Sequence, residues 1–83
     1  MAHYVYILYS EKANRYYIGS TSNTEGRLQR HNAGATPSTK QGRPWKIVYT
    51  EIFISKAEAL QREMYLKRMK SRVYLEDLIA KKN

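Results

Sequence analysis

Tyrosine side chains are concentrated near the start of the chain, where five of the eight lie between residues 4 and 19. If these positions only packed the core, Val, Ile or Phe would be sufficient, because a buried tyrosine has a hydroxyl group that needs a hydrogen-bond partner. Tyr4 and Tyr6 share one face of a strand because side chains alternate, and Tyr17 and Gly19 share a face in the same way. This pattern predicts a row of phenolic hydroxyls, on a half-buried hairpin surface or in a functional site.

Arg27 and His31 are four residues apart and therefore lie on one face of the helix that we expect in this region. An arginine suits phosphate binding because its planar guanidinium donates two parallel hydrogen bonds to phosphate oxygens. The same spacing also occurs on ordinary solvated helix surfaces. The spacing alone leaves both interpretations open.

Glu63 differs from most of the seven acidic residues because it borders the apolar stripe of a predicted helix that should pack on the sheet. Glu25 and Glu58 instead have positions typical of helix caps. The alternative role for Glu63 is an ion pair with Lys67, four residues later, which contributes only about 0.3–0.5 kcal/mol when it is exposed. From the spacing alone, the ion pair is the favoured interpretation.

The elements that must position these residues begin with a hairpin. Residues 4–9 and 15–19 are aromatic and β-branched and are separated by a polar break, which predicts two strands and a turn. Ser22 and Glu25 have the spacing of a capping box and predict that a helix begins here. Residues 32–44 form a long loop with hydroxyls and cations, which is either functional or a plain flexible connection.

The second half of the chain predicts one more strand and two helices. Residues 45–54 form the third strand, and Trp45 is expected to anchor the core rather than to stack on a base. Ser55 and Glu58 repeat the capping-box spacing at the start of a second helix. The predicted apolar stripe of that helix consists of Ala57, Leu60 and Met64. Residues 75–79 indicate a short third helix.

These elements predict one α+β domain over residues 1–83, an α/β sandwich. We expect a three-stranded antiparallel sheet with residues 4–9 in its central strand, flanked by about three helices in the order β-β-α-β-α-α. The net charge of +8 and the pI near 9.9 suggest a polyanionic partner, and nucleic acid is the first candidate. The alternative is that the positive charge only keeps the protein soluble.

The composition also limits the other classes of partner and site. The chain has no cysteine, which excludes disulfides and thiolate zinc sites and fits a reducing compartment, so we expect a cytoplasmic protein. No apolar run approaches the length that spans a membrane, and we expect no membrane partner. We favour a monomer.

Two short motifs in the hairpin resemble the signatures of the GIY-YIG endonuclease superfamily. Tyr4-Val5-Tyr6 keeps only the final tyrosine of the first signature, whereas Tyr17-Ile18-Gly19 matches the second in full. Arg27, His31 and Glu63 follow in the family's order, with Glu63 in an Ala-x-x-x-Glu context. The resemblance covers nearly the whole chain and is to the small, stand-alone, single-domain members.

The resemblance implies phosphodiester hydrolysis assisted by one Mg²⁺ or Mn²⁺ ion. Tyr6 would be the general base, with its pKa lowered by nearby cations, and Tyr17 would hold the water or a phosphate oxygen. Arg27 would clamp the phosphate, with help from His31, and Glu63 would be the only metal ligand from the protein. We expect Tyr6, Tyr17, Arg27 and Glu63 to line one concave patch beside Gly19, and a Glu63 on the opposite side of the sheet would contradict this interpretation.

The implied substrate is nucleic acid, DNA more than RNA, with branched or damaged structures and DNA repair as candidate contexts. The cations expected to contact it are Arg30, Lys40, Arg43 and Lys46. Two alternatives are a nucleic-acid-binding module without significant turnover and an interaction domain whose tyrosines only form a core. The former predicts salt-dependent binding without cleavage, and the latter predicts no binding.

Overall fold

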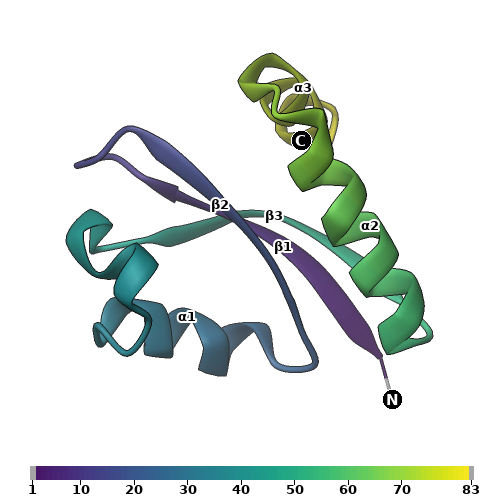
Figure 1. Ribbon diagram of the computed structural model, residues 1–83, viewed down its shortest axis with the longest axis horizontal. Coiled ribbons are helices and arrows are strands. Elements are labelled where there is room, and N and C mark those ends of the chain that lie inside the picture. The colour runs from purple at the N-terminus through teal and green to yellow at the C-terminus, as the bar shows by residue number, and fades with distance from the viewer. Residues whose placement is uncertain (1, 83) are drawn as a thin grey trace.

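The aromatic and β-branched run at the start of the chain forms the central strand of the sheet. In the computed structural model, which describes residues 2–82, β1 (His3–Ser10) lies between β2 (Arg15–Thr21) and β3 (Lys46–Phe53). It pairs antiparallel with both neighbours (Figure 1). The predicted central position of this strand is confirmed, and β2 and β3 are the two edges of the sheet.

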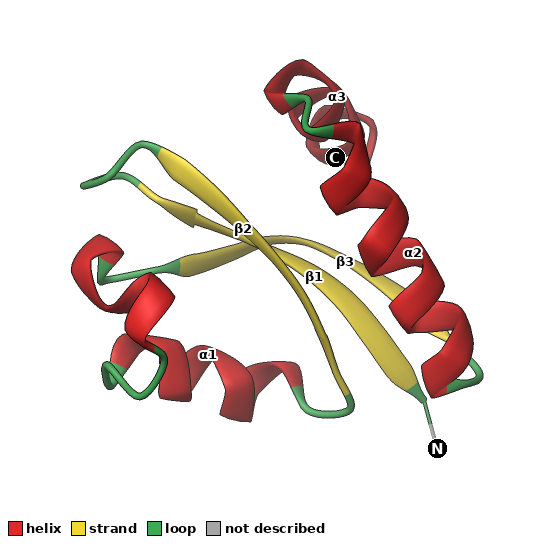
Figure 2. Ribbon diagram, in the orientation of Figure 1, coloured by secondary structure: helices red, strands yellow, loops and turns green. Residues whose placement is uncertain are grey.

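Helices cover both faces of the sheet (Figure 2). The helix α1 (Thr24–Asn32) and the short 3-10 helix η1 (Pro37–Gly42) lie on one side, and α2 (Lys56–Met69) and α3 (Arg72–Lys82) lie on the other. The predicted α+β class and the order β-β-α-β-α-α are confirmed, with η1 as an addition. No helix in residues 2–82 is long and apolar enough to cross a membrane.

The alternation of side chains along β1 divides the apolar residues into two cores. Val5 and Ile7 pack with Ala59 and Leu66 of α2, whereas Tyr6 and Leu8 belong to the core on the α1 side. Burial of an aliphatic side chain of this size contributes roughly 1.5–3 kcal/mol. A single strand therefore stabilises both layers and places Tyr6 toward α1.

The two predicted helix caps have different outcomes. Asn23, rather than Ser22, caps α1, because its side-chain oxygen accepts a hydrogen bond of 3.0 Å from the backbone N–H of Gly26. The prediction was wrong by one residue because neighbouring Ser and Asn can both satisfy the first free amides of a helix. The second cap is confirmed, since the Ser55 hydroxyl accepts from the backbone N–H of Glu58 at 3.2 Å.

The segment 32–44 is folded rather than a plain loop. Its anchor is Trp45, which is only 3% exposed and whose indole N–H donates to the carbonyl of Thr39 at 2.7 Å. The Asn32 side chain accepts from the Trp45 backbone N–H at 2.6 Å and donates to its carbonyl at 3.0 Å. Trp45 is thus the predicted core anchor, and it fixes η1 against α1.

The apolar stripe predicted for α2 is wrong. Leu60 and Met64 are 39% and 58% exposed, and the buried residues of the helix are Ala59 and Leu66. Arg62 lies near this inner face and binds Glu51 of β3 through two hydrogen bonds of 2.9 and 3.0 Å. Hydrophobic periodicity failed because paired polar side chains occupy positions toward the sheet.

Candidate active site

The hydroxyl of Tyr6 is the centre of the candidate site. Tyr6 is 1% exposed and lies opposite Gly19 in the β1–β2 register. A Cβ atom on Gly19 would lie 2.4 Å from the Tyr6 Oη, so only glycine leaves room for the phenol ring. The ring therefore lies across β2, and its hydroxyl lies over an edge strand of the sheet.

His31 of α1 is the hydrogen-bond partner of Tyr6. Its Nε2 lies 3.1 Å from the Tyr6 Oη, and its Nδ1 lies 2.9 Å from Oγ1 of Thr39 in η1. Because the Thr39 hydroxyl donates to the carbonyl of Thr36 at 3.2 Å, it accepts from Nδ1–H. We assign the tautomer from this network: Nδ1 carries the proton and Nε2 accepts from Tyr6.

Burial dominates the electrostatics of this pair. It raises the pKa of Tyr6 to about 12, with help from Tyr17, while the Arg27 guanidinium acts to lower it. Burial, together with Arg27 and Arg30, lowers the pKa of His31. The expectation that cations lower the pKa of Tyr6 is wrong for the protein side chains alone, because desolvation outweighs Arg27.

Tyr17 and Arg27 complete the α1 side of the site. The Tyr17 ring is half-buried, and its centroid lies 4.8 Å from that of His31 and 6.5 Å from that of Tyr6. Arg27 lies one turn before His31, is half-buried, and is close enough to affect the pKa of Tyr6. The solvated-surface interpretation of Arg27 and His31 is therefore wrong for His31, which is 1% exposed.

Glu63 reaches the β2 edge of the sheet from the face opposite Tyr6. Its helix α2 packs on the sheet face opposite α1, so Glu63 and Tyr6 do not line one face as expected. The carboxylate nevertheless lies at the β2 edge, where Oε1 accepts from the Ser20 hydroxyl at 2.7 Å. Ser20 directly follows Gly19, and the Glu63 charge contributes to the raised pKa of Tyr6. The two groups thus converge on β2 from opposite faces.

Comparisons with known proteins show the family of this domain. The model of the GIY-YIG catalytic domain matches residues 2–75. The chain belongs to the GIY-YIG family. A UPF0213 protein of Staphylococcus haemolyticus is 48% identical over 66 residues, which are 78% of this chain and 79% of the relative. Another, from Natronomonas pharaonis, is 43% identical over 94% of this chain and 91% of its own.

A solved structure supports the fold of this GIY-YIG domain. The solution NMR structure of a UPF0213 protein from Bacillus halodurans has a TM-score of 0.59 and 36% sequence identity. The match covers 96% of this chain and 84% of that one. The three-stranded antiparallel sheet with flanking helices is therefore the fold shared with a structurally determined relative.

Glu63 is the predicted metal ligand, and its carboxylate lies at the β2 edge. Among residues 2–82, no group of three or more His, Cys, Asp or Glu side chains could form a metal site. Mg²⁺ fits a single carboxylate, since it usually keeps several waters and takes other ligands from substrate phosphates. The Lys67 ammonium lies 2.6 Å from Oε2 of Glu63, so the predicted ion pair is present and competes with a metal for this oxygen.

The predicted nucleic-acid-binding cations differ in their exposure and in their partners. Arg30 and Lys40 are exposed, whereas the Arg43 Nε donates to the carbonyl of Lys40 at 2.8 Å. The Lys46 ammonium pairs with Glu11 at 3.0 Å. Lys46 is therefore partly neutralised beside the hairpin turn.

Sequence reasoning did not single out two residues that contact the site. Thr39 lies in the segment noted for its hydroxyls, but no local signal separates it from its neighbours there. Ser20 could have been found from its position directly after the Tyr17-Ile18-Gly19 motif. Both contacts join residues that are distant in the sequence, to His31 and to Glu63.

Proposed function

We propose that this protein is a metal-dependent nuclease that hydrolyses phosphodiester bonds in nucleic acid. We propose DNA rather than RNA as the main substrate, and branched or damaged DNA as candidate forms of it. The observation that carries the proposal is the contact of 3.1 Å between the Tyr6 hydroxyl and Nε2 of His31, over the opening left by Gly19. Membership in the GIY-YIG family supports the same class of reaction.

In the proposed reaction, the Tyr6 hydroxyl gives its proton to Nε2 of His31, and the phenolate then takes a proton from the attacking water. Neutral His31 is available near pH 7 because its pKa is lowered below the usual 6.5. Because the pKa of Tyr6 is raised to about 12 while that of His31 is lowered, this proton transfer is uphill. Additional positive charge near Tyr6 is therefore required during the reaction, and Arg27 supplies part of it.

The remaining residues would bind and orient the phosphate. Arg27 donates to the phosphoryl oxygens, where negative charge increases during attack, and Tyr17 holds the water or one of these oxygens. Glu63 would hold Mg²⁺ or Mn²⁺. When bound, the ion supplies charge stabilisation for the phosphoryl and leaving oxygens.

A nucleic-acid-binding module without significant turnover is the second candidate. Three observations favour it: the Tyr6 hydroxyl is buried with its pKa raised, both carboxylate oxygens of Glu63 already have partners, and α2 brings Glu63 to β2 from the sheet face opposite Tyr6, the placement that counts against the nuclease interpretation. A binder of this kind needs the positive charge of the protein but not proton transfer by Tyr6.

A cleavage assay separates the two candidates. Labelled single-stranded, flapped and branched DNA and RNA are incubated with Mg²⁺ or Mn²⁺ and with wild type, Tyr6→Phe or Glu63→Gln. We expect both variants to lose cleavage while metal-free binding persists. Glu76→Gln is the matched control, because Glu76 also pairs with a cation four residues away, Arg72 at 3.1 Å.

Thermal melts of the same variants exclude a folding defect. Gln is nearly as good a helix former as Glu, so Glu63→Gln should change stability by less than about 1 kcal/mol. Full cleavage by Glu63→Gln would refute the metal role. Salt-dependent binding with no cleavage by wild type on any substrate would replace the nuclease with the binding module.

A further inference from the structure

Two adjacent residues of α2 contact opposite edges of the sheet. Arg62 binds Glu51 on β3 through hydrogen bonds of 2.9 and 3.0 Å, whereas Glu63 accepts a hydrogen bond of 2.7 Å from Ser20 on β2. Adjacent residues of an α-helix project about 100° apart. The two side chains therefore diverge over the two flanks of the helix, and their contacts span the full width of the sheet.

The strand register places both contacts in one row of the sheet. Val5 of the central strand pairs with Ser20 on one side and with Glu51 on the other. Val5 is completely buried in the core beneath α2. Neighbouring strands lie about 4.8 Å apart, so the row is about 10 Å wide. Arg62 and Glu63 thus hold its two ends, with Val5 between them.

The next row of the sheet contains the centre of the candidate active site. Tyr6 follows Val5 on β1, pairs with Gly19, and points to the opposite face. Successive residues of a strand are about 3.3 Å apart. The charge of Glu63 acts across this short distance, since it contributes to the raised pKa of Tyr6. A helix fixed on the row of Val5 therefore also fixes Glu63 relative to Tyr6.

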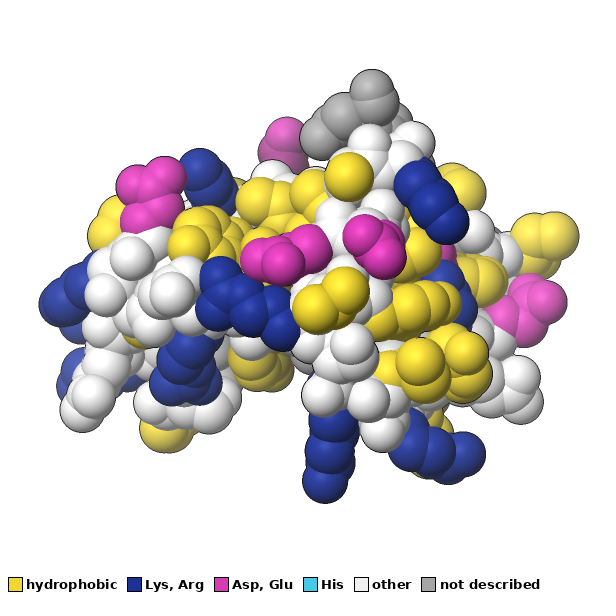
Figure 3. Space-filling model, turned by 90° about the horizontal axis from the view of Figure 1, so that it is seen from above, with side chains coloured by type: hydrophobic (Ala, Val, Ile, Leu, Met, Phe, Trp, Pro, Cys, Tyr) yellow, Lys and Arg dark blue, Asp and Glu magenta, His cyan; other side chains and the backbone are white. Residues whose placement is uncertain are grey.

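Arg62 is held differently from the surface cations of the protein. Basic side chains project into solvent over much of the face shown in Figure 3, whereas the side chains of Arg62 and Glu51 are only 26% and 19% exposed. The Glu51 carboxylate also accepts from the Tyr49 hydroxyl, and the guanidinium lies 5.5 Å from the centre of the Tyr65 ring. A planar guanidinium that binds both oxygens of a carboxylate has a defined orientation. Arg62 can therefore fix the rotation of α2 about its axis.

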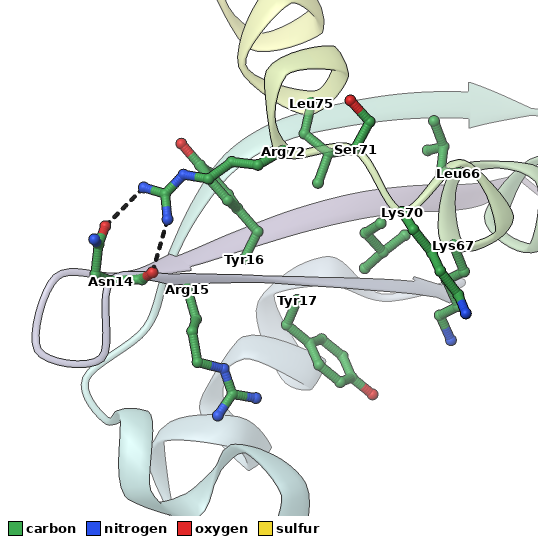
Figure 4. Close-up of a pocket in the computed structure, with 11 residues that line it drawn as sticks. Asn14, Arg15, Tyr16, Tyr17, Leu66, Lys67, Lys70, Ser71, Arg72 and Leu75 are labelled. Atoms are coloured by element: carbon green, nitrogen blue, oxygen red, sulfur yellow. Dashed lines mark hydrogen bonds between the residues drawn. The ribbon is translucent and has the colours of Figure 1, made fainter.

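Apolar packing constrains the β2 side of α2 less. The helix buries Ala59 and Leu66, and Ala59 contributes only a methyl group. One turn beyond Glu63, a pocket of about 400 Å³ opens between α2 and β2, with Leu66 and Lys67 on one wall and Tyr17 on the other (Figure 4). Side chains extend about 5–6 Å from a helix axis, so a rotation of about 20° moves them by about 2 Å. Such a rotation is enough to break the hydrogen bond of Glu63.

We propose that Arg62 and Glu51 are positioning residues, because their ion pair sets the rotation of α2 that brings the Glu63 carboxylate to Ser20. The importance of this position for cleavage rests on the proposed nuclease function, but the geometry that the pair maintains does not. A purely structural ion pair would hold α2 on β3 without an effect on β2. The two roles therefore differ in what happens at the far edge of the sheet when the pair is altered.

The test measures the coupling between Ser20 and Glu63 in a double-mutant cycle of Ser20→Ala and Glu63→Ala, followed by denaturant unfolding. In wild type the two substitutions should be non-additive by roughly twofold to tenfold in the unfolding equilibrium constant. In an Arg62→Lys background, which keeps the charge but loses the planar fork, they should become additive. Arg68→Lys, an exposed arginine on the same helix, is the matched control and should leave the coupling unchanged.

Two further backgrounds separate position from stability. Glu51→Gln keeps the shape of the side chain but removes the charge that Arg62 binds, so it should abolish the coupling as Arg62→Lys does. Leu75→Ala removes apolar burial from the same core without a change at the ion pair. It should lower the melting temperature while the coupling persists. Equal loss of coupling in Leu75→Ala would assign the effect to general destabilisation and overturn the proposal.

Cleavage by the same variants tests the proposed nuclease separately. Arg62→Lys and Glu51→Gln should reduce kcat by about 10-fold to 100-fold with little change in metal-free nucleic-acid binding. Additive effects in wild type, or a coupling that survives in both variants, would overturn the positioning role, and cleavage that depends on Glu63 would still support the nuclease. Loss of coupling in both variants, without any cleavage by wild type, would retain the positioning role and reject the nuclease.

Discussion

The Oη atom of Tyr6 lies 3.1 Å from Nε2 of His31, and the other ring nitrogen of His31 lies 2.9 Å from the Thr39 hydroxyl. All three side chains are at most 1% exposed. Thr39 therefore acts on Tyr6 through His31, because it fixes the tautomer that leaves Nε2 free to accept a proton.

Replacement of Thr39 by Val should disturb this relay without a change in side-chain shape. The Nδ1–H of His31 would lose its acceptor inside the core, which costs about 1–3 kcal/mol of unfolding free energy. We expect a lower melting temperature, slower cleavage and a shift of His31 toward the Nε2–H tautomer. The ¹⁵N chemical shifts of the imidazole report the tautomer. Thr39→Ser keeps the hydroxyl and should retain the Nδ1–H tautomer of wild type.

Acid should destabilise the fold through His31. Its pKa is lowered in the folded protein, mainly by burial and then by Arg27 and Arg30, so the unfolded chain binds a proton more readily. Stability should therefore fall as the pH decreases below about 6.5, the pKa of an unfolded histidine. Melts between pH 8 and 5 measure the slope. An equal slope in His31→Gln would assign the effect to other groups.

Gly19→Ala should displace the Tyr6 ring. The added Cβ would lie 2.4 Å from Oη and 2.5 Å from Cζ, both in a side chain packed inside the core. Overpacking of this kind costs about 1–3 kcal/mol and should greatly reduce cleavage. In a Tyr6→Leu background the same substitution should cost much less. Equal costs in the two backgrounds, measured by denaturant unfolding, would show that the ring is not the obstacle.

Lys67→Gln should strengthen metal binding by Glu63. The ammonium of Lys67 lies 2.6 Å from Oε2, and its removal takes away a cation that competes for this oxygen. Half-exposed pairs of this type are worth less than about 1 kcal/mol, so the apparent Mn²⁺ affinity should rise by about twofold to fivefold in the presence of nucleic acid. Titration calorimetry measures it, with Lys56→Gln as the control.

The sequence by itself determined the order of the elements, the central strand, the Ser55 cap and the family motifs. These features depend on alternation, turn residues and helix signals within a few positions, which are local properties of the chain. The sequence also predicted that Tyr6, Tyr17, Arg27 and His31 belong to one site. The cap at Asn23 was missed by one residue because adjacent polar residues compete for the same amides.

Only the tertiary structure decided how the site is assembled. The bond from Tyr6 to His31 spans 25 positions and that from Ser20 to Glu63 spans 43, and such contacts follow from packing rather than from local pattern. The inner face of α2 was mispredicted because paired polar residues lie there. The raised pKa of Tyr6 likewise depends on how deeply the fold buries its hydroxyl, since desolvation is a property of the assembled core.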